Sequence, residues 1–133
     1  MKIASERRKR RSNELRRAIR FQFQHVVEQY GIKDVALADG RGLLVASHDE
    51  SQRNHVLAAY APLFSRVVDP LTRQRMFNSL RMHEPDIEPG EIAIRSFRVM
   101  GESLYLFAVG SDGVKREVGI YRAVAGVRRI LNY

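Results

Sequence analysis

The sequence predicts an α+β domain in which an antiparallel sheet is covered by helices on both faces. Two short apolar runs, residues 35–38 and 43–47, flank the segment Asp-Gly-Arg-Gly at 39–42, and Asp-Gly between hydrophobic runs is typical of a β-hairpin because glycine adopts positive φ without a Cβ clash. Neither arm alternates between apolar and polar residues, so both faces of the hairpin are expected to be buried. Segments with helical apolar periodicity precede and follow the hairpin, and these would cover it.

The first helix is predicted over residues 13–30, because apolar residues recur at helical spacing along it. Ser12 or Asn13 offers an N-cap, and Gly31 follows where a left-handed C-terminal cap belongs. The apolar stripe of this helix is Leu15, Ile19, Phe23, Val26 and Tyr30.

Two further helices are expected after the hairpin. The segment 47–51 is rich in capping residues and opens the second helix, in which Pro62 predicts a kink or a restart because it removes one backbone hydrogen bond. Asp69 followed by Pro70 is typical of a helix start and predicts a short third helix. The remaining elements are a loop, a strand, a turn, a buried strand and a last helix, at residues 83–90, 91–99, 100–103, 104–109 and 115–131.

The composition is that of one globular domain of 133 residues. The chain has no cysteine, which excludes disulfides and thiolate metal ligands and fits a reducing compartment. No apolar run approaches the roughly 20 residues of a membrane-spanning helix, and no apolar run follows the basic start as a secretory signal requires. These features predict a cytoplasmic protein.

The positive charge is concentrated at the N-terminus. Residues 1–20 hold nine basic and two acidic side chains, whereas the other 113 residues hold 14 and 13. Residues 1–12 are therefore predicted to be a disordered basic arm that precedes a domain at 13–133. Its function as a docking tail, as a nucleic-acid contact or as a membrane-surface contact is left open, and no aromatic residue lies in it for base stacking. The candidate anion-binding residues are Arg7, Arg8, Lys9, Arg10, Arg11, Arg16, Arg17 and Arg20.

No pattern in the sequence favours an enzyme, a metal site or a cofactor. Ser47-His48-Asp49 contains the residue types of a catalytic triad, but a triad is defined by geometry in space and sequence neighbours do not supply it. The four histidines lack the spacing of zinc ligands. The acidic residues of the 83–91 segment are interpreted as a solvated loop.

The hairpin sequence resembles the opening hairpin of the Roadblock (dynein light chain) domains. In that family a hydrophobic strand, an Asp, a Gly and a second strand ending in Ala-Ser follow a helix, and residues 35–47 have this pattern. Residues 55–61, His-Val-Leu-Ala-Ala-Tyr-Ala, are similar to the Ala-rich helix that follows. Residues 97–110 and 115–131 are similar to the later strands and the last helix.

The resemblance implies a profilin-like α/β/α sandwich of four or five strands, with the second helix on one face and the first and last helices on the other. It also implies a non-enzymatic homodimer that acts as a regulator or scaffold for a small Ras-like GTPase or a signalling complex. Two alternatives stay open, a nucleic-acid-binding protein that uses the basic arm and a small-ligand sensor of the PAS or GAF type. Bulky core residues are expected to fill the pocket that a sensor needs. The implied dimer contacts are Val56, Leu57, Tyr60, Phe64, Ile92, Ile94 and Ser96.

Overall fold

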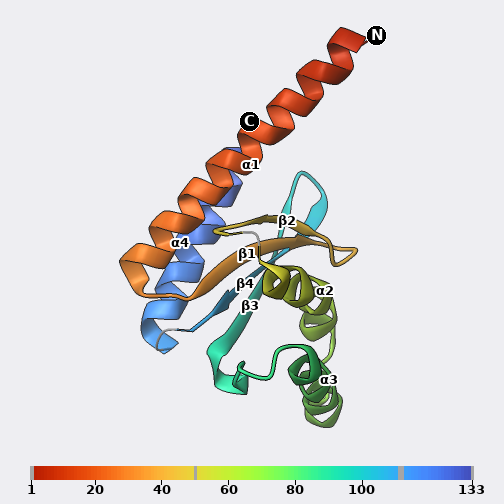
Figure 1. Ribbon diagram of the computed structural model, residues 1–133, viewed down its shortest axis with the longest axis vertical. Coiled ribbons are helices and arrows are strands. Elements are labelled where there is room, and N and C mark those ends of the chain that lie inside the picture. The colour runs from red at the N-terminus through yellow and green to blue at the C-terminus, as the bar shows by residue number, and fades with distance from the viewer. Residues whose placement is uncertain (1, 50, 111–112, 133) are drawn as a thin grey trace.

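The computed structural model describes residues 2–49, 51–110 and 113–132 (Figure 1). The element order agrees with the prediction, including the third helix. The elements are α1 (Lys2–Tyr30), β1 (Asp34–Asp39), β2 (Leu44–Ser47), α2 (Gln52–Arg66), α3 (Pro70–His83), a 3₁₀ turn (Pro89–Glu91), β3 (Ile92–Val99), β4 (Glu102–Val109) and α4 (Gly113–Leu131).

The four strands form one antiparallel sheet in the order β2-β1-β4-β3. Helices α1 and α4 lie on one face of it, and α2 lies on the other with α3 beside it (Figure 1). The prediction of helices on both sides of the sheet is confirmed. The hairpin prediction holds for β1, which is buried on both faces, whereas the edge strand β2 is only partly buried. No fifth strand occurs in the described ranges.

The sheet separates two apolar clusters. On the α1 and α4 side, Phe23 and Ile19 pack against inward residues of β1, β3 and β4, together with Ile120 of α4. On the α2 side, the cluster is built around Phe64 and Phe107. Alternate residues of β4 therefore face opposite clusters, which explains why its sequence shows no apolar–polar alternation.

Asp39 and Gly42 shape the first hairpin. Asp39 Oδ1 accepts hydrogen bonds from the N–H groups of Arg41 and Leu43, at 2.9 and 3.1 Å. The glycine with positive φ is Gly42, at 83°, and not Gly40 as the Asp-Gly pattern suggests. A Cβ at Gly42 would also lie 3.1 Å from the Ala59 Cα of α2, so the loop approaches this helix more closely than a side chain permits.

Helix α2 starts as predicted and continues through its proline. The Ser51 side chain accepts a hydrogen bond from the Asn54 N–H and caps the helix. The predicted restart at Pro62 is wrong, because the helix is continuous from Gln52 to Arg66. Pro62 has no N–H and therefore lacks one backbone hydrogen bond of the helix, but the residue is buried.

The basic N-terminus is helical, which corrects the prediction of a disordered arm and of a helix start at Ser12 or Asn13. Helix α1 begins at Lys2 and runs for 29 residues without a break. The segment contains no Gly or Pro, and Ala, Arg, Lys and Glu have high helix propensity, so the core-packed part of the helix can extend into it. Figure 1 shows its N-terminal turns projecting beyond the sheet.

The β3–β4 turn holds a residue with a strained backbone conformation at its tip. Met100 and Gly101 have φ values of 52° and 82°, and positive φ at both central residues defines a type I′ turn. Met100 is the non-glycine residue with positive φ among the described parts of the chain, and its side chain is 77% exposed.

Replacing Met100 by Asn is therefore expected to stabilise the protein by about 1 kcal/mol, because Asn tolerates the left-handed region and no buried contact is lost. Urea unfolding of Met100→Asn checks this. Met100→Ala is the matched control, since alanine keeps the strain. Equal unfolding midpoints for the two variants would contradict the assignment of strain to this turn.

Candidate protein-interaction site

Strand β3 is an edge of the sheet, and its outer side has no neighbouring strand among the described residues. The Gly110 N–H donates to the Glu91 carbonyl at 3.0 Å, so Glu91 and Gly110 form a hydrogen-bonded pair. Such pairs alternate along an antiparallel ladder. It follows from the β3–β4 register that the backbone N–H and C=O groups of the even-numbered residues point away from β4, and these residues are Ile92, Ile94, Ser96 and Arg98.

An open groove of about 790 Å³ lies beside this edge. It runs between β3 on one side and α3 with the end of α2 on the other. Its lining is mixed, because apolar side chains of Phe64, Phe77, Ile92 and Ile94 alternate with polar ones that include three arginines. The lining residues are Phe64, Ser65, Pro70, Arg73, Gln74, Phe77, Asn78, Arg81, Ile92, Ile94, Arg95 and Ser96.

The wall of the groove is held by contacts between α2 and α3. Phe64 packs edge-on against Phe77, with ring centroids 6.5 Å apart, and the Arg73 guanidinium lies 6.0 Å from the Phe64 ring. The Tyr60 hydroxyl is 2.7 Å from the Ser79 hydroxyl, within hydrogen-bond distance. Asp69 caps the start of α3 through the Thr72 N–H. These contacts position an apolar surface next to unpaired backbone groups.

The seven predicted dimer contacts divide into two sets. Ile92, Ile94 and Ser96 lie on the open edge and line the groove. Leu57 and Phe64 are 3% and 7% exposed and face their own sheet, so they offer little surface of their own to a second subunit.

The remaining two α2 contacts are partly covered. Val56 and Tyr60 are half-buried against the same cluster as Leu57. The strongest apolar stripe of a helix packs into its own core, and this is the stripe that the sequence selected. The exposed face of α2 instead carries His55, Ala59 and Leu63.

The eight predicted cationic residues lie on α1 and are all exposed. None of them forms an ion pair with a carboxylate of the described residues. They are distant in the fold from the β3 groove, because α1 lies on the opposite face of the sheet (Figure 1).

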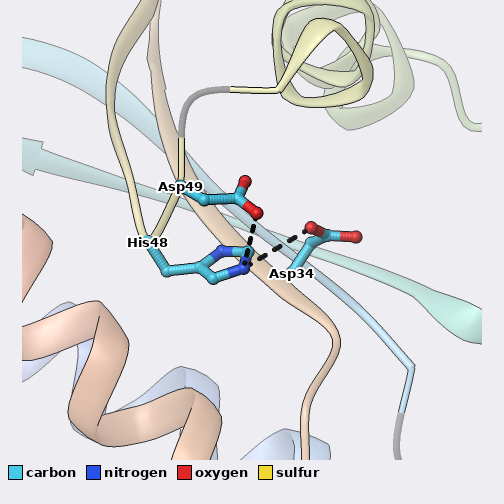
Figure 2. A group of neighbouring side chains, drawn as sticks. All are labelled: Asp34, His48 and Asp49. Carbon is cyan, nitrogen blue, oxygen red and sulfur yellow. Dashed lines mark ion pairs between the residues drawn. The ribbon is translucent and has the colours of Figure 1, made fainter.

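A second polar cluster forms where β1 begins and β2 ends. Figure 2 shows the His48 ring lying between the carboxylates of Asp34 and Asp49. His48 Nε2 is 3.7 Å from Asp34 Oδ1 and 3.5 Å from Asp49 Oδ2, and Arg53 Nε is 3.5 Å from Asp34 Oδ2. Burial raises the pKa of Asp34, and the Arg53 and His48 charges only partly offset this effect.

Asp34, His48 and Asp49 have the atoms of a metal site, but their hydrogen bonds do not fit one. The Val35 N–H donates to His48 Nδ1 at 3.4 Å, so the neutral ring carries its proton on Nε2, the atom that faces the carboxylates. Metal-bound histidine needs the reverse, with the second ring nitrogen donating its proton to an acceptor. The cluster instead ties β2 to β1, because the His48 N–H also donates to the Val35 carbonyl.

Sequence reasoning missed this cluster because it considered His48 only with its neighbours Ser47 and Asp49. The hairpin register was the available signal. Ala36 pairs with Ser47, and continuing that register places Asp34 opposite Asp49. The Ser47 hydroxyl donates to the Asp49 carbonyl, so Ser47 takes part in a turn and not in a triad.

Asp34→Asn and Asp39→Asn should change stability with opposite dependence on pH. Because the pKa of Asp34 is raised in the folded state, ionisation of Asp34 costs stability as pH rises from the ordinary pKa of 3.8 to the folded pKa. The stability of Asp34→Asn should therefore increase relative to that of the wild type as pH rises above 3.8. Burial alone would raise the pKa of Asp39, but hydrogen bonds from the Leu43 and Arg41 N–H groups lower it. Ionised Asp39 therefore stabilises the folded protein above pH 3.8, its ordinary pKa, and this stability is lost as pH falls through the folded pKa. The stability of Asp39→Asn should therefore decrease relative to that of the wild type as pH rises. Urea unfolding at several pH values measures both, and parallel curves would contradict the account.

The arrangement of a four-stranded antiparallel sheet between α1 with α4 and α2 with α3 defines the profilin-like fold of the Roadblock type, which the hairpin sequence predicted. The solved structure of Myxococcus xanthus MglB shares it. That structure aligns with 85% of this chain over 86% of its own length, at a TM-score of 0.51 and 16% sequence identity. At this identity the likeness establishes the fold.

No protein-family model matches the sequence, and a comparison with curated proteins finds no match. Over the described residues, no helix has the length and apolar character needed to cross a membrane.

Proposed function

We propose that this protein is a non-enzymatic, cytoplasmic homodimer that serves as a platform or regulator for a small Ras-like GTPase. The observation that carries the proposal is the open edge of β3 beside a groove of mixed polar and apolar lining, in a fold shared with MglB. The Roadblock resemblance of residues 35–47 implies the GTPase partner.

The β3 edge supports the dimer on physical grounds. An edge strand with unpaired backbone groups favours pairing with another strand, and a second copy of the same strand is the partner that twofold symmetry supplies. Antiparallel pairing of two β3 strands would satisfy the outward groups of Ile92, Ile94 and Ser96. It would also cover the side chains of Ile92 and Ile94 in the groove, which are half-exposed in one protomer.

The sensor alternative receives no support from the space between the sheet and α2. Phe64, Tyr105 and Phe107 fill that space, with exposures of 7%, 7% and 1%. The groove beside β3 is open to solvent and lies at the sheet edge, so it suits a protein surface better than an enclosed ligand.

A pull-down tests the GTPase partner. The full chain is immobilised, native lysate is treated with nuclease and passed over it, and the retained proteins are identified. Parallel samples contain GDP or a non-hydrolysable GTP analogue. The proposal expects a G-domain protein to be retained with a preference for one nucleotide, because a regulator distinguishes the two states of its GTPase. Recovery of no G-domain protein with either nucleotide would contradict it.

A further inference from the structure

We propose that the projecting part of α1, residues 2–14, docks in the major groove of double-stranded B-form DNA and binds its phosphates without reading sequence. The inference does not depend on the GTPase partner or on the dimer. The segment is a helix and not a disordered arm. A preformed helix loses little conformational entropy on binding, which favours docking.

The described side chains of the projecting segment, Ser5 to Glu14, do not pack on the rest of their protomer. Every residue from Ser5 to Glu14 is polar and exposed, whereas one face of the same helix is buried from Ile19 onward. The stripe that faces the core at Ile19 and Phe23 ends toward the N-terminus at half-buried Leu15 and continues beyond it as Ser12 and Arg8. An apolar partner helix therefore has no surface to pack on, and the available interactions are electrostatic.

The cations surround this helix. At 100° per residue, the five consecutive cations of the projecting segment, Arg7 to Arg11, leave no gap wider than about 100° on the helical circumference. A flat anionic membrane reaches only one side of such a helix, and no apolar face is present to insert into it. A nucleic-acid groove has phosphates on both flanks, so it can engage cations on both sides of the helix at once.

The dimensions select the DNA duplex among nucleic acids. A helix with side chains is about 10–12 Å across, and the major groove of B-DNA is about 12 Å wide. The projecting 13 residues extend about 20 Å, which is enough to follow the groove across both phosphate backbones. The major groove of duplex RNA is too deep and narrow for such entry. Single strands are bound by stacking on aromatic side chains, and the sequence has none in residues 1–20.

The test measures the affinity of the full chain for a labelled 20-base-pair DNA duplex of arbitrary sequence by fluorescence anisotropy. If about four phosphates are contacted, affinity should fall about 100-fold between roughly 50 and 200 mM salt. The arm variant combines Arg7→Gln, Arg8→Gln, Lys9→Gln and Arg10→Gln, which keeps good helix formers in place. It should bind at least tenfold more weakly, with a smaller salt slope.

The matched control removes the same charge elsewhere, by Arg66→Gln, Arg75→Gln, Arg122→Gln and Arg129→Gln, all at exposed positions outside the arm. It should bind within about threefold of the wild type, since non-contacting charges act only at long range. Far-UV circular dichroism verifies that both variants are folded. Equal losses in the two variants would overturn the proposal, because net charge alone would then explain binding.

Two further probes separate the competing partners. Duplex RNA of the same length should bind more weakly than DNA at the same salt, and equal affinity would overturn groove docking. Vesicles containing anionic lipid should show no arm-dependent binding at a salt concentration where DNA is bound. Arm-dependent binding to vesicles in the absence of DNA binding would assign the helix to a membrane surface and overturn the proposal.

Discussion

Ser96→Pro should convert the protein from a dimer to a folded monomer. Ser96 lies in the middle of β3, its side chain is exposed, and its N–H points to the open edge by the register of the ladder. Proline removes this N–H and places a ring at the edge, which blocks a second strand while leaving the hydrogen bonds to β4 in place. Light scattering should then give 15.3 kDa for the variant and twice that mass for the wild type.

Ser96→Thr is the control for this result. Threonine keeps the backbone N–H and favours strand conformation, so the variant should remain a dimer. Unfolding curves of both variants establish that the protomer is folded. If Ser96→Pro is folded and has the same mass as the wild type, the dimer is not built on this edge.

Phe23→Ala should destabilise the protein by about 3–5 kcal/mol, whereas deletion of residues 2–12 should change stability by less than about 0.5 kcal/mol. Phe23 is fully buried among residues of β1, β4 and α4, so its loss leaves a cavity. The side chains from Ser5 to Ser12 are all exposed, so their removal costs no packing. Urea unfolding measures both free energies.

Phe21→Ala provides the matched control on the same helix. Phe21 is 73% exposed, and its removal should change stability by no more than about 0.5 kcal/mol. A destabilisation by the deletion comparable to that of Phe23→Ala would contradict the domain boundary predicted near residue 13.

The parts of the fold that sequence predicted are those where burial and local signals agree. The hairpin at 35–47 was recognised because both of its faces are apolar, and the structure buries β1 almost completely. Asp69-Pro70 located α3 because the capping carboxylate and the fixed φ of proline act within one turn.

The predictions failed for features that depend on contacts between residues distant in sequence, or on a helix continuing beyond its packed part. The basic segment was predicted to be disordered from its composition, but a helix nucleated by the packing of Ile19 and Phe23 continues into it. The cluster of Asp34 with His48 joins residues 14 positions apart, which only the strand register brings together. The dimer stripe expected on α2 stays a prediction, and Leu57 and Phe64 of that stripe are already buried in their own protomer, because apolar periodicity identifies a buried face without showing which molecule buries it.

The central claim, that the outer edge of β3 is paired in a dimer, is tested most directly by hydrogen exchange of individual β3 amides in the full-length protein. Within one protomer the Arg95 and Phe97 N–H groups are directed to β4, whereas those of Ile94 and Ser96 have no strand partner. The account predicts slow exchange at all four amides, because a second β3 protects Ile94 and Ser96. Protection of Arg95 and Phe97 together with rapid exchange of Ile94 and Ser96 would contradict it.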